Sequence, residues 1–314
     1  MNKNLTVISL ISYLFALSII NHAAFASADS TEFNLTEIAE GNFLHAGLHV
    51  SIDDKQHDDI ANIGFIIGES CVAVIDTGGS IKVGSNLLKS IQAKTDKPIC
   101  YVINTHVHFD HILGNKVFAS DKTEFVGHHQ LADEVERNKP FFLENYKNDL
   151  GENPDEKSII GPDILVDKSM DLELGNRKLT LIPYSVSHSH TDLIVIDNKT
   201  ATLWAGDLIF RQRIPSLTGS LKGWIKVMTE LTTLDVKLVV PGHGSIANSV
   251  TEALKNQQHY LTRLLDDTRK AIAEGQFISD AMETIDKENK SNWLLHEHQH
   301  PSNVSKAFTE LEWE

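Results

Sequence analysis

The feature that most constrains the fold of this chain is a run of metal-binding side chains directly after a short apolar segment. Residues 99–103 are all hydrophobic and include two isoleucines and a valine, which predicts a short buried strand. Three histidines and one aspartate follow within six residues, namely His106, His108, Asp110 and His111. Because the end of a buried strand is a rigid point from which a loop can aim side chains, this pattern predicts an α/β protein with a metal site at one edge of its sheet.

The length and net charge of the chain limit its number of domains and its possible binding partners. Its 314 residues are enough for one large domain or two modest ones. The formal net charge is −15, from 28 Lys and Arg against 43 Asp and Glu. This acidic balance argues against a nucleic-acid or anionic-membrane partner. The 16 histidines are a mild excess that a metal site partly explains.

The first 28 residues differ in kind from the rest. Lys3 precedes an apolar run from Leu5 to Ile20, and A-x-A sites follow at 24–26 and 26–28. This order predicts a cleavable signal peptide at 1–28, with an uncleaved membrane anchor as the alternative. We therefore expect a mature chain of 29–314, exported to a bacterial periplasm, with no stable membrane insertion.

Two cysteines remain, Cys71 and Cys100. Cys71 lies five residues before Asp76 and Cys100 five residues before Thr105, where the two candidate strands end, so the two could be neighbours in adjacent strands. An oxidising compartment permits a disulfide, but cross-strand geometry is often poor for one. Two buried thiols are therefore the favoured interpretation.

The first half of the chain reads as strands followed by helices. Apolar patterning predicts antiparallel strands at 43–52, 60–67 and 71–75, a helix at 80–93 and a further helix at 130–147. The strand at 71–75 ends in Asp76, and its helix leads into the strand at 99–103. A strand–helix–strand unit is right-handed, so Asp76 and His106 should emerge at the same sheet edge. Residues 148–162 are polar and predict an exposed loop. His128 and His129 could add ligands, but the favoured interpretation places them in a loop or helix cap.

The second half repeats this order after a break near residue 160. Strands are predicted at 178–183, 193–196, 202–205 and 238–240, and helices at 217–234, 250–274, 280–288 and 304–311. Three strand ends supply further donors: His188 or His190, then Asp207, then His243. Glycines beside Asp207 and His243 suit tight turns around a site.

The donors sum to two sets. His106, His108 and His188 would hold one metal, and Asp110, His111 and His243 a second, with Asp207 placed to bridge them. Nitrogen and carboxylate donors without thiolate indicate two Zn²⁺ ions, with Fe or Mn as alternatives. The alternative for any single residue is a buried, hydrogen-bonded polar group.

The same set resembles the metallo-β-lactamase superfamily: H-x-H-x-D-H, a lone His, a bridging Asp and a late G-H, over about residues 40–250. The resemblance implies an α/β fold built as a four-layer αββα sandwich, a single domain with a C-terminal helical extension. The family pattern of His, Ser or Thr, two residues and Asp or Asn fits His188 better than His190. Asp76, in the D-T-G motif, would orient a ligand histidine. Diiron flavoprotein relatives usually have Glu at the position of His108, so the chain resembles the zinc hydrolases.

Residues 202–224 and 303–314 resemble the quinoprotein relay system zinc metallohydrolase group. That resemblance implies an exported zinc metallohydrolase. We predict that it uses a hydroxide between two zinc ions on a small ester, thioester or lactone. The resemblance also implies association with a quinoprotein (PQQ) dehydrogenase or a cytochrome. Asp110 and Asp207 would be the catalytic carboxylates. Arg211, Arg213 and Lys222 would hold an anionic part of the substrate, or else lie in a solvated loop.

Two other functions remain open at this point. One is a class B β-lactamase-like enzyme that opens a cyclic amide, and the other is a non-hydrolytic metal-binding accessory protein of a periplasmic redox system. The histidines at 296, 298 and 300 could bind a stray metal, but their alternation favours a solvated face.

Overall fold

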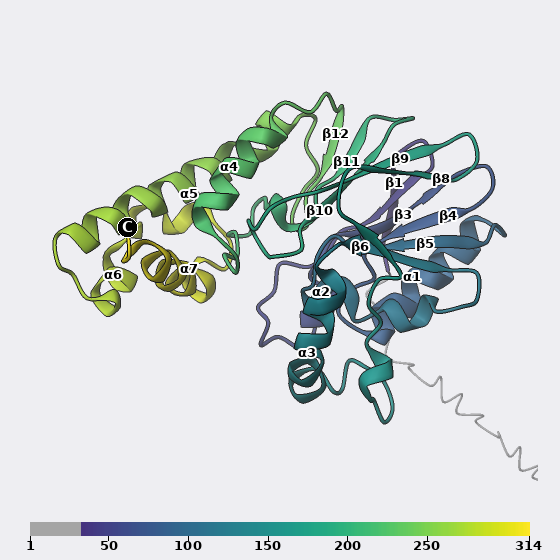
Figure 1. Cartoon of the computed structure of the whole chain (residues 1–314), viewed down its shortest axis with the longest axis horizontal. Helices are drawn as coiled ribbons and strands as arrows, with labels where there is room; N and C mark the ends of the chain where they lie inside the picture. Colours follow the sequence, from purple (N-terminus) through teal and green to yellow (C-terminus); the bar gives the residue numbers. More distant parts are fainter. Residues whose placement is uncertain (1–32) are drawn as a thin grey trace, which may run out of the picture. The chain divides into compact units, whose positions relative to one another are not determined.

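The computed structural model describes residues 33–314, apart from the side chains of 287–289. The signal peptide predicted at 1–28 lies outside these residues. Two β-sheets lie face to face in the described part of the chain (Figure 1). The first sheet has seven strands in chain order: β1 (Leu35–Ala39), β2 (Asn42–His45), β3 (Ile63–Ile67), β4 (Val72–Ile75), β5 (Ile99–Ile103), β6 (Glu124–His128) and β7 (Ile164–Val166).

The second sheet has five strands in the order β12-β11-β10-β9-β8. Their bounds are β8 (Met170–Glu173), β9 (Lys178–Pro183), β10 (Leu193–Asp197), β11 (Thr202–Trp204) and β12 (Leu238–Val240). Strands β1 to β4 and β8 to β11 are antiparallel, whereas β4 to β7 and the pair β11–β12 are parallel. Each half of the chain therefore contributes one sheet, and the change of sheet falls between β7 and β8.

Alternation along the strands separates the central core from the outer faces. Ile103 and Val195 point into the space between the two sheets, where they pack with Trp204. Their neighbours in the sequence, Val102 and Ile194, point outward against helices. Strands that bury both faces are apolar throughout, which explains why their sequences show little polar alternation.

Helices cover both outer faces and complete four layers. The first sheet packs against α1 (Ile81–Lys94), through Leu87 and Ile91. The second packs against α4 (Leu221–Leu231) and α5 (Val250–Ala273), through Trp224 and Leu254. Ser80, Ser220 and Ser249 cap these three helices by accepting a backbone N–H. The predicted αββα sandwich is confirmed.

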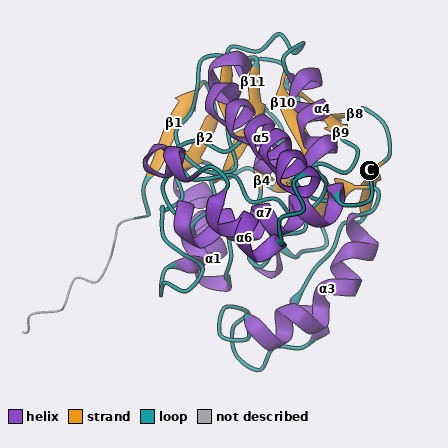
Figure 2. Ribbon diagram, turned by 90° about the vertical axis from the view of Figure 1, so that its left-hand side faces the viewer, coloured by secondary structure: helices purple, strands orange, loops and turns teal. Residues whose placement is uncertain are grey.

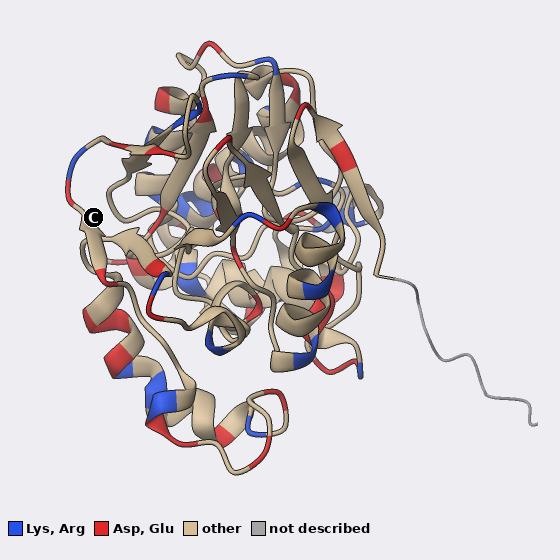
Figure 3. Ribbon diagram, turned by 90° about the vertical axis from the view of Figure 1, so that its right-hand side faces the viewer, with Lys and Arg blue, Asp and Glu red and all other residues tan. Residues whose placement is uncertain are grey.

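The other helices lie beside the layers. They are α2 (Phe109–Ile112), α3 (Leu131–Asn145), α6 (Ile278–Thr284) and α7 (His296–Leu311), with short 3-10 turns η1 (His57–Asp59), η2 (Asn115–Phe118), η3 (Glu156–Ser158), η4 (Gly206–Leu208) and η5 (Lys287–Asn292). Figure 2 shows α5, α6 and α7 gathered in front of the strands. Acidic and basic residues are interspersed on the face shown in Figure 3. No helix of the described residues is both long and apolar enough to cross a membrane.

Several predicted bounds are wrong. The strand expected at 43–52 ends at His45, and residues 46–62 form a loop. The backbone of this loop is hydrogen-bonded to the second half of the chain, since Asn62 N donates to Gly242 O at 2.8 Å. The short strands β1, β6, β7 and β8 were not predicted. The last helix begins at His296, eight residues before the expected start, since the polar first turns hid its periodicity.

The prediction of two free thiols is also wrong. Cys71 and Cys100 form a disulfide, with their Cα atoms 5.8 Å apart. Cys71 lies directly before β4 and Cys100 lies in β5, and the register of this parallel pair shifts at Val72. The Cα distance lies within the range that a disulfide can bridge, so these neighbouring strands do permit the bond.

A buried ion pair ties the two sheets together. Arg177 and Asp197 are both buried and their Nη2 and Oδ2 atoms are 2.7 Å apart. Asn42 of β2 donates to the same carboxylate at 2.8 Å, and Arg177 also donates to the carbonyl of Ile67 at 2.8 Å. The pair therefore satisfies polar groups from both sheets.

We expect Arg177→Met to destabilise the protein strongly, because it leaves the Asp197 carboxylate buried without its cation. Removing one partner of a buried pair costs roughly 3–5 kcal/mol of unfolding free energy. Lys178→Met is the matched control, since the Lys178–Asp171 pair is about half exposed on both sides. Chemical denaturation measures both, and equal stability of the two variants would contradict this role of Arg177.

Candidate metal centre

Strand ends from both sheets bring the predicted donors together. His106, His108, Asp110 and His111 follow β5, and α2 turns the last two toward the centre. His188 lies in the loop between β9 and β10, Asp207 in η4 after β11, and His243 three residues after the end of β12. A Cβ atom on Gly242 would lie 1.9 Å from Asp207 Oδ1, so only glycine allows this approach.

The first donor set consists of three histidine nitrogens. His108 Nδ1 lies 3.0 Å from His106 Nε2 and 2.9 Å from His188 Nε2. Asp207 Oδ2 lies 3.3 Å from His188 Nε2 and 3.6 Å from His106 Nε2. One carboxylate oxygen of Asp207 therefore faces this set.

The second donor set faces the other oxygen of the same carboxylate. Asp207 Oδ1 lies 3.2 Å from His111 Nε2 and 3.3 Å from His243 Nε2. Asp110 Oδ2 lies 3.6 Å from His111 Nε2 and 3.4 Å from His243 Nε2. The structure thus brings together all seven predicted ligands in the two predicted sets, with Asp207 between them.

Oxygen atoms outside the centre hold the imidazole rings. His111 Nδ1 donates to Asp76 Oδ2 at 2.7 Å, so Asp76 lies where the D-T-G motif implied. His188 Nδ1 and His243 Nδ1 donate at 2.7 Å to the carbonyls of Ser216 and Ile60. Each contact directs the Nε2 lone pair of its ring into the centre, as outer contacts do at metal sites.

Thr105 was not singled out from the sequence, although it directly precedes the cluster. Its hydroxyl donates to Asp76 Oδ2 at 2.7 Å and accepts from His106 Nδ1 at 3.0 Å. Ser216 and Ile60 contact the ligand histidines through their backbone carbonyls. Every residue has such a carbonyl, so the sequence could not identify these two positions. Thr105 thus joins His106 and His111 to one buried carboxylate.

The electrostatics favour neutral ligands in one set and positive charge in the other. Burial lowers the pKa of His108 and of His188 to about 4, and lowers that of His106 well below its usual value. At His111 burial also lowers the pKa, but the carboxylates of Asp207, Asp110 and Asp76 outweigh it and raise the pKa well above the usual value. The side of the centre around His111 therefore stabilises a cation.

The polar groups at the centre fit divalent metal ions. His111 Nε2 and Asp207 Oδ1 are buried and have no hydrogen-bond partner among the described residues. Buried polar atoms normally have such a partner, and a bound metal ion supplies one where the protein does not. Imidazole nitrogens and carboxylate oxygens are the donors that Zn²⁺ takes in the absence of thiolate.

A cavity of about 250 Å³ opens onto the donors from outside. Its walls include Ile52 of the 46–62 loop, Phe141 of α3, Gln299 of α7, and Thr218, which lies in the loop before α4. The long loop before β3 and the C-terminal helices therefore shape the space in front of the centre.

Only one of the three predicted substrate-binding cations lines this cavity. Arg213 does, and its buried Nη1 atom makes no hydrogen bond to any described residue. Arg211 donates instead to the Ser245 carbonyl at 3.0 Å and pairs with Glu252, and Lys222 pairs with Glu314 at 2.7 Å. The expected substrate contact of Arg211 and Lys222 is not supported, because both side chains are held elsewhere.

The remaining histidines also differ in part from expectation. His190 is exposed whereas His188 is fully buried, as the family pattern favoured. His128 ends β6 and is buried, so it lies in a strand and not in the predicted loop. Its Nδ1 atom accepts from Gln130 N at 3.1 Å directly before α3, which agrees with the helix-cap alternative. The solvated face predicted for residues 296, 298 and 300 is wrong at His296 and His300, which are buried.

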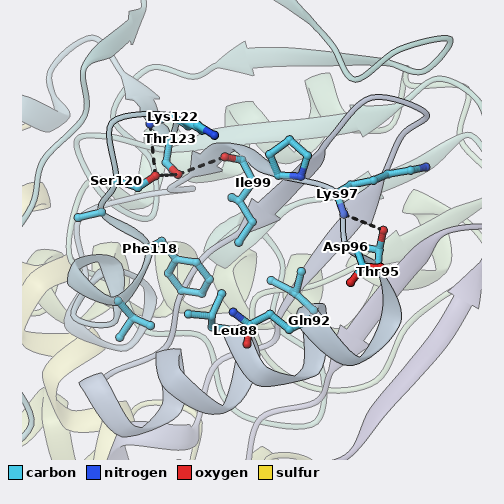
Figure 4. Close-up of a pocket in the computed structure, with 14 residues that line it drawn as sticks. Leu88, Gln92, Thr95, Asp96, Lys97, Ile99, Phe118, Ser120, Lys122 and Thr123 are labelled. Carbon is cyan, nitrogen blue, oxygen red and sulfur yellow. Dashed lines mark hydrogen bonds between the residues drawn. The ribbon is translucent and has the colours of Figure 1, made fainter.

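The largest of the cavities described lies away from the donors. It has a volume of about 450 Å³ and is bounded by the end of α1 and the start of β5 (Figure 4). Leu88, Phe118 and Ile99 form its apolar side, and Thr123 donates to the carbonyl of Ile99 at 3.1 Å. None of the seven donors lines it.

Comparison with known proteins agrees with the architecture. The family model of the metallo-beta-lactamase superfamily matches residues 58–243, more than half of the chain. No curated protein matches the chain in sequence. A metallo-beta-lactamase from Pontibacter korlensis is 18% identical with a TM-score of 0.60, over 74% of this chain and 99% of that one. The sec-alkylsulfatase Pisa1 from Pseudomonas sp. is 14% identical with a TM-score of 0.66, over 88% of this chain and 49% of that one.

We expect His188→Ala to lower the zinc content by up to one ion per chain, because it removes one of three nitrogens from the first set. His190→Ala, two residues away and exposed, is the matched control and should leave the content unchanged. Elemental analysis after dialysis measures both variants. Equal zinc in the two would contradict the assignment of His188.

Proposed function

Because the chain belongs to the metallo-β-lactamase superfamily, we propose that it is an exported dinuclear zinc hydrolase of a small ester, thioester or lactone. Members of the superfamily bind divalent metals, usually zinc, and are typically hydrolases. The observation that carries the proposal is the pair of donor sets that share Asp207 at the floor of an open cavity. A pure binding site would not need two adjacent metal sets with open access.

Two bound zinc ions would supply Lewis acidity and would lower the pKa of water to near 7. One ion would be held by His106, His108 and His188, and the other by Asp110, His111 and His243. Asp207 would contact both ions. Asp110 lies on the cavity side of its set and is placed to orient the attacking water. The outer oxygens of Asp76 and Thr105 keep the rings fixed during turnover, since a fixed centre needs no reorganisation.

The walls of the cavity suit an apolar substrate body. The rings of Phe109 and Tyr146 are stacked with centroids 4.3 Å apart, and Phe142 lies beside them. Burial raises the pKa of Tyr146 to about 12, so its hydroxyl stays neutral and can donate a hydrogen bond. This wall would bind an acyl or alkyl group and exclude water from it.

Arg213 favours a substrate with an anionic part. Burial lowers its pKa from the usual value, opposed by the carboxylates of Asp110 and Asp207. The guanidinium remains charged, and a buried charge with a free donor atom is stabilised when an anion binds. A sulfate ester is therefore a second candidate substrate, and the fold is shared with a sec-alkylsulfatase.

The proposed export and the proposed quinoprotein dehydrogenase or cytochrome partner derive from sequence resemblance. The two segments that carry the resemblance, 202–224 and 303–314, are in contact. Ser220 donates to Glu310 at 2.7 Å, and Leu217 N donates to Asn303 Oδ1 at 3.0 Å. Because the two segments touch, we propose that they form a single surface, and that this surface is what the chain has in common with the quinoprotein relay group.

A substrate panel tests the hydrolase proposal. The zinc-loaded mature protein should hydrolyse members of a series of lactones, thioesters and aryl esters, with nitrocefin and a secondary alkyl sulfate as the competing classes. Turnover of nitrocefin alone would indicate a cyclic-amide hydrolase. Failure on every class, together with tight binding to a quinoprotein dehydrogenase or cytochrome, would overturn the proposal in favour of an accessory protein.

We expect Arg213→Met to raise KM for an anionic substrate about tenfold or more while a neutral ester of similar size is affected less, because one charge-assisted contact is worth roughly 1.5–3 kcal/mol. Lys222→Met is the control, since its side chain lies outside the cavity. Steady-state kinetics measures KM for the anionic and the neutral substrate in each variant. Equal effects on the anionic and neutral substrates would contradict an anion-binding role.

A further inference from the structure

A second group of metal-binding side chains lies in the C-terminal helices. Asp286 follows α6, His296 begins α7, and His300 lies one turn later in α7. All three are buried, and one donor atom from each lies within 4.8 Å of the others. The helices that carry them are those gathered in front of the strands in Figure 2.

His296 is the residue without a satisfied partner. Its side chain is 93% buried, since its relative exposure is 7%, and its Nε2 atom makes no hydrogen bond to any described residue. The nearest carboxylate oxygen is Oδ2 of Asp286, at 4.0 Å. This distance is too long for a hydrogen bond, although the two groups face one another.

His300 lies beside His296 and is hydrogen-bonded at both of its ring nitrogens. Its ring stacks on that of His296 with centroids 4.4 Å apart, as residues four apart on a helix can. Its Nδ1 atom lies 2.9 Å from the Tyr260 hydroxyl, and its Nε2 atom lies 2.9 Å from the Ile285 carbonyl. The Tyr260 contact is of the kind that orients a metal-bound imidazole from outside.

We propose that Asp286, His296 and His300 form a further divalent-cation site, separate from the centre at Asp207, that takes Zn²⁺ or a similar ion. Two imidazole nitrogens and one carboxylate oxygen are a zinc-type donor set. With Zn–N and Zn–O bonds near 2.1 Å, two donors on one tetrahedral ion lie roughly 3.4 Å apart. The 4.0 Å gap between Asp286 and His296 closes by less than about 1 Å when the ion binds.

The surroundings permit an ion to enter and bind. A cavity of about 250 Å³ is lined by Asp286, Tyr260 and Trp293 and gives access to the carboxylate. In the free protein His300 Nε2 donates to the Ile285 carbonyl, so binding at Nε2 requires the ring proton to move to Nδ1, which then donates to the Tyr260 hydroxyl. Binding also gives His296 Nε2 the partner that it lacks.

The site would stabilise the wall of the catalytic cavity. Tyr260, which contacts His300, accepts from Asn303 Nδ2 at 2.9 Å, and the same amide donates to the Pro215 carbonyl at 2.7 Å. The next residue, Ser216, holds the ring of His188 through its carbonyl. A cation at Asp286 therefore fixes α7 against the loop that orients one ligand of the first set.

The test compares the zinc content of variants of the mature chain. Each variant is dialysed against Zn²⁺, and its zinc is then measured by elemental analysis. His296→Gln and Asp286→Asn should each bind one ion fewer per chain than the unmodified protein. His298→Gln changes an exposed histidine on the same helix and should bind the same number. Because the readout is a difference between variants, it does not depend on occupancy or activity of the centre at Asp207.

Thermal unfolding supplies a second readout. Added Zn²⁺ should raise the Tm of the unmodified protein and of His298→Gln more than that of His296→Gln, since ligand binding to the folded state stabilises it. His296→Gln should fold, because it removes an atom that lacks a partner. Equal zinc content and an equal Tm response in His296→Gln and the unmodified protein would overturn the proposal.

Discussion

The carboxylate of Asp207 occupies the point where the two halves of the chain meet. One of its oxygens faces His106 and His188 and the other faces His111 and His243, all within 3.6 Å. Burying a carboxylate costs several kcal/mol unless positive charge lies beside it. Burial raises the pKa of this carboxyl, but the four surrounding histidines outweigh that effect and hold the pKa well below its usual value. The group is therefore held as an anion, which cations beside its oxygens would stabilise.

The sandwich makes this arrangement possible. Strand β5 of the first sheet and the parallel pair β11–β12 of the second sheet are each followed by donors to the centre, so donors distant in sequence meet without a long loop. The rings are then fixed by oxygens from three further segments, at Asp76, Ile60 and Ser216. Ser216 is followed by Leu217, whose backbone is held by Asn303 of α7, so the C-terminal helices support the centre as well as the cavity wall.

Much of this could be predicted from the sequence because the signals were local. The apolar run at 99–103 gave the strand with its bounds, and the spacing of His106 to His111 gave the centre. Other features depended on contacts that only the folded chain makes. Arg211 and Arg213 are two residues apart in one loop, yet only Arg213 faces the cavity. His296 looked solvated because its helix is polar, but α7 buries one side of its first turn. The Cys71–Cys100 bond depends on how the two strands pair in space, which the sequence pattern does not reveal.

The central claim is that one carboxylate is shared by two metal ions. Anomalous diffraction from crystals of the zinc-loaded protein at the zinc absorption edge tests it most directly. The account predicts two strong peaks about 3.5–4 Å apart, the separation of two-metal hydrolase sites, one beside His106, His108 and His188 and one beside Asp110, His111 and His243. Asp207 would lie between them with one oxygen toward each. A single peak at this position, or two peaks with Asp207 bound to neither, would contradict the account.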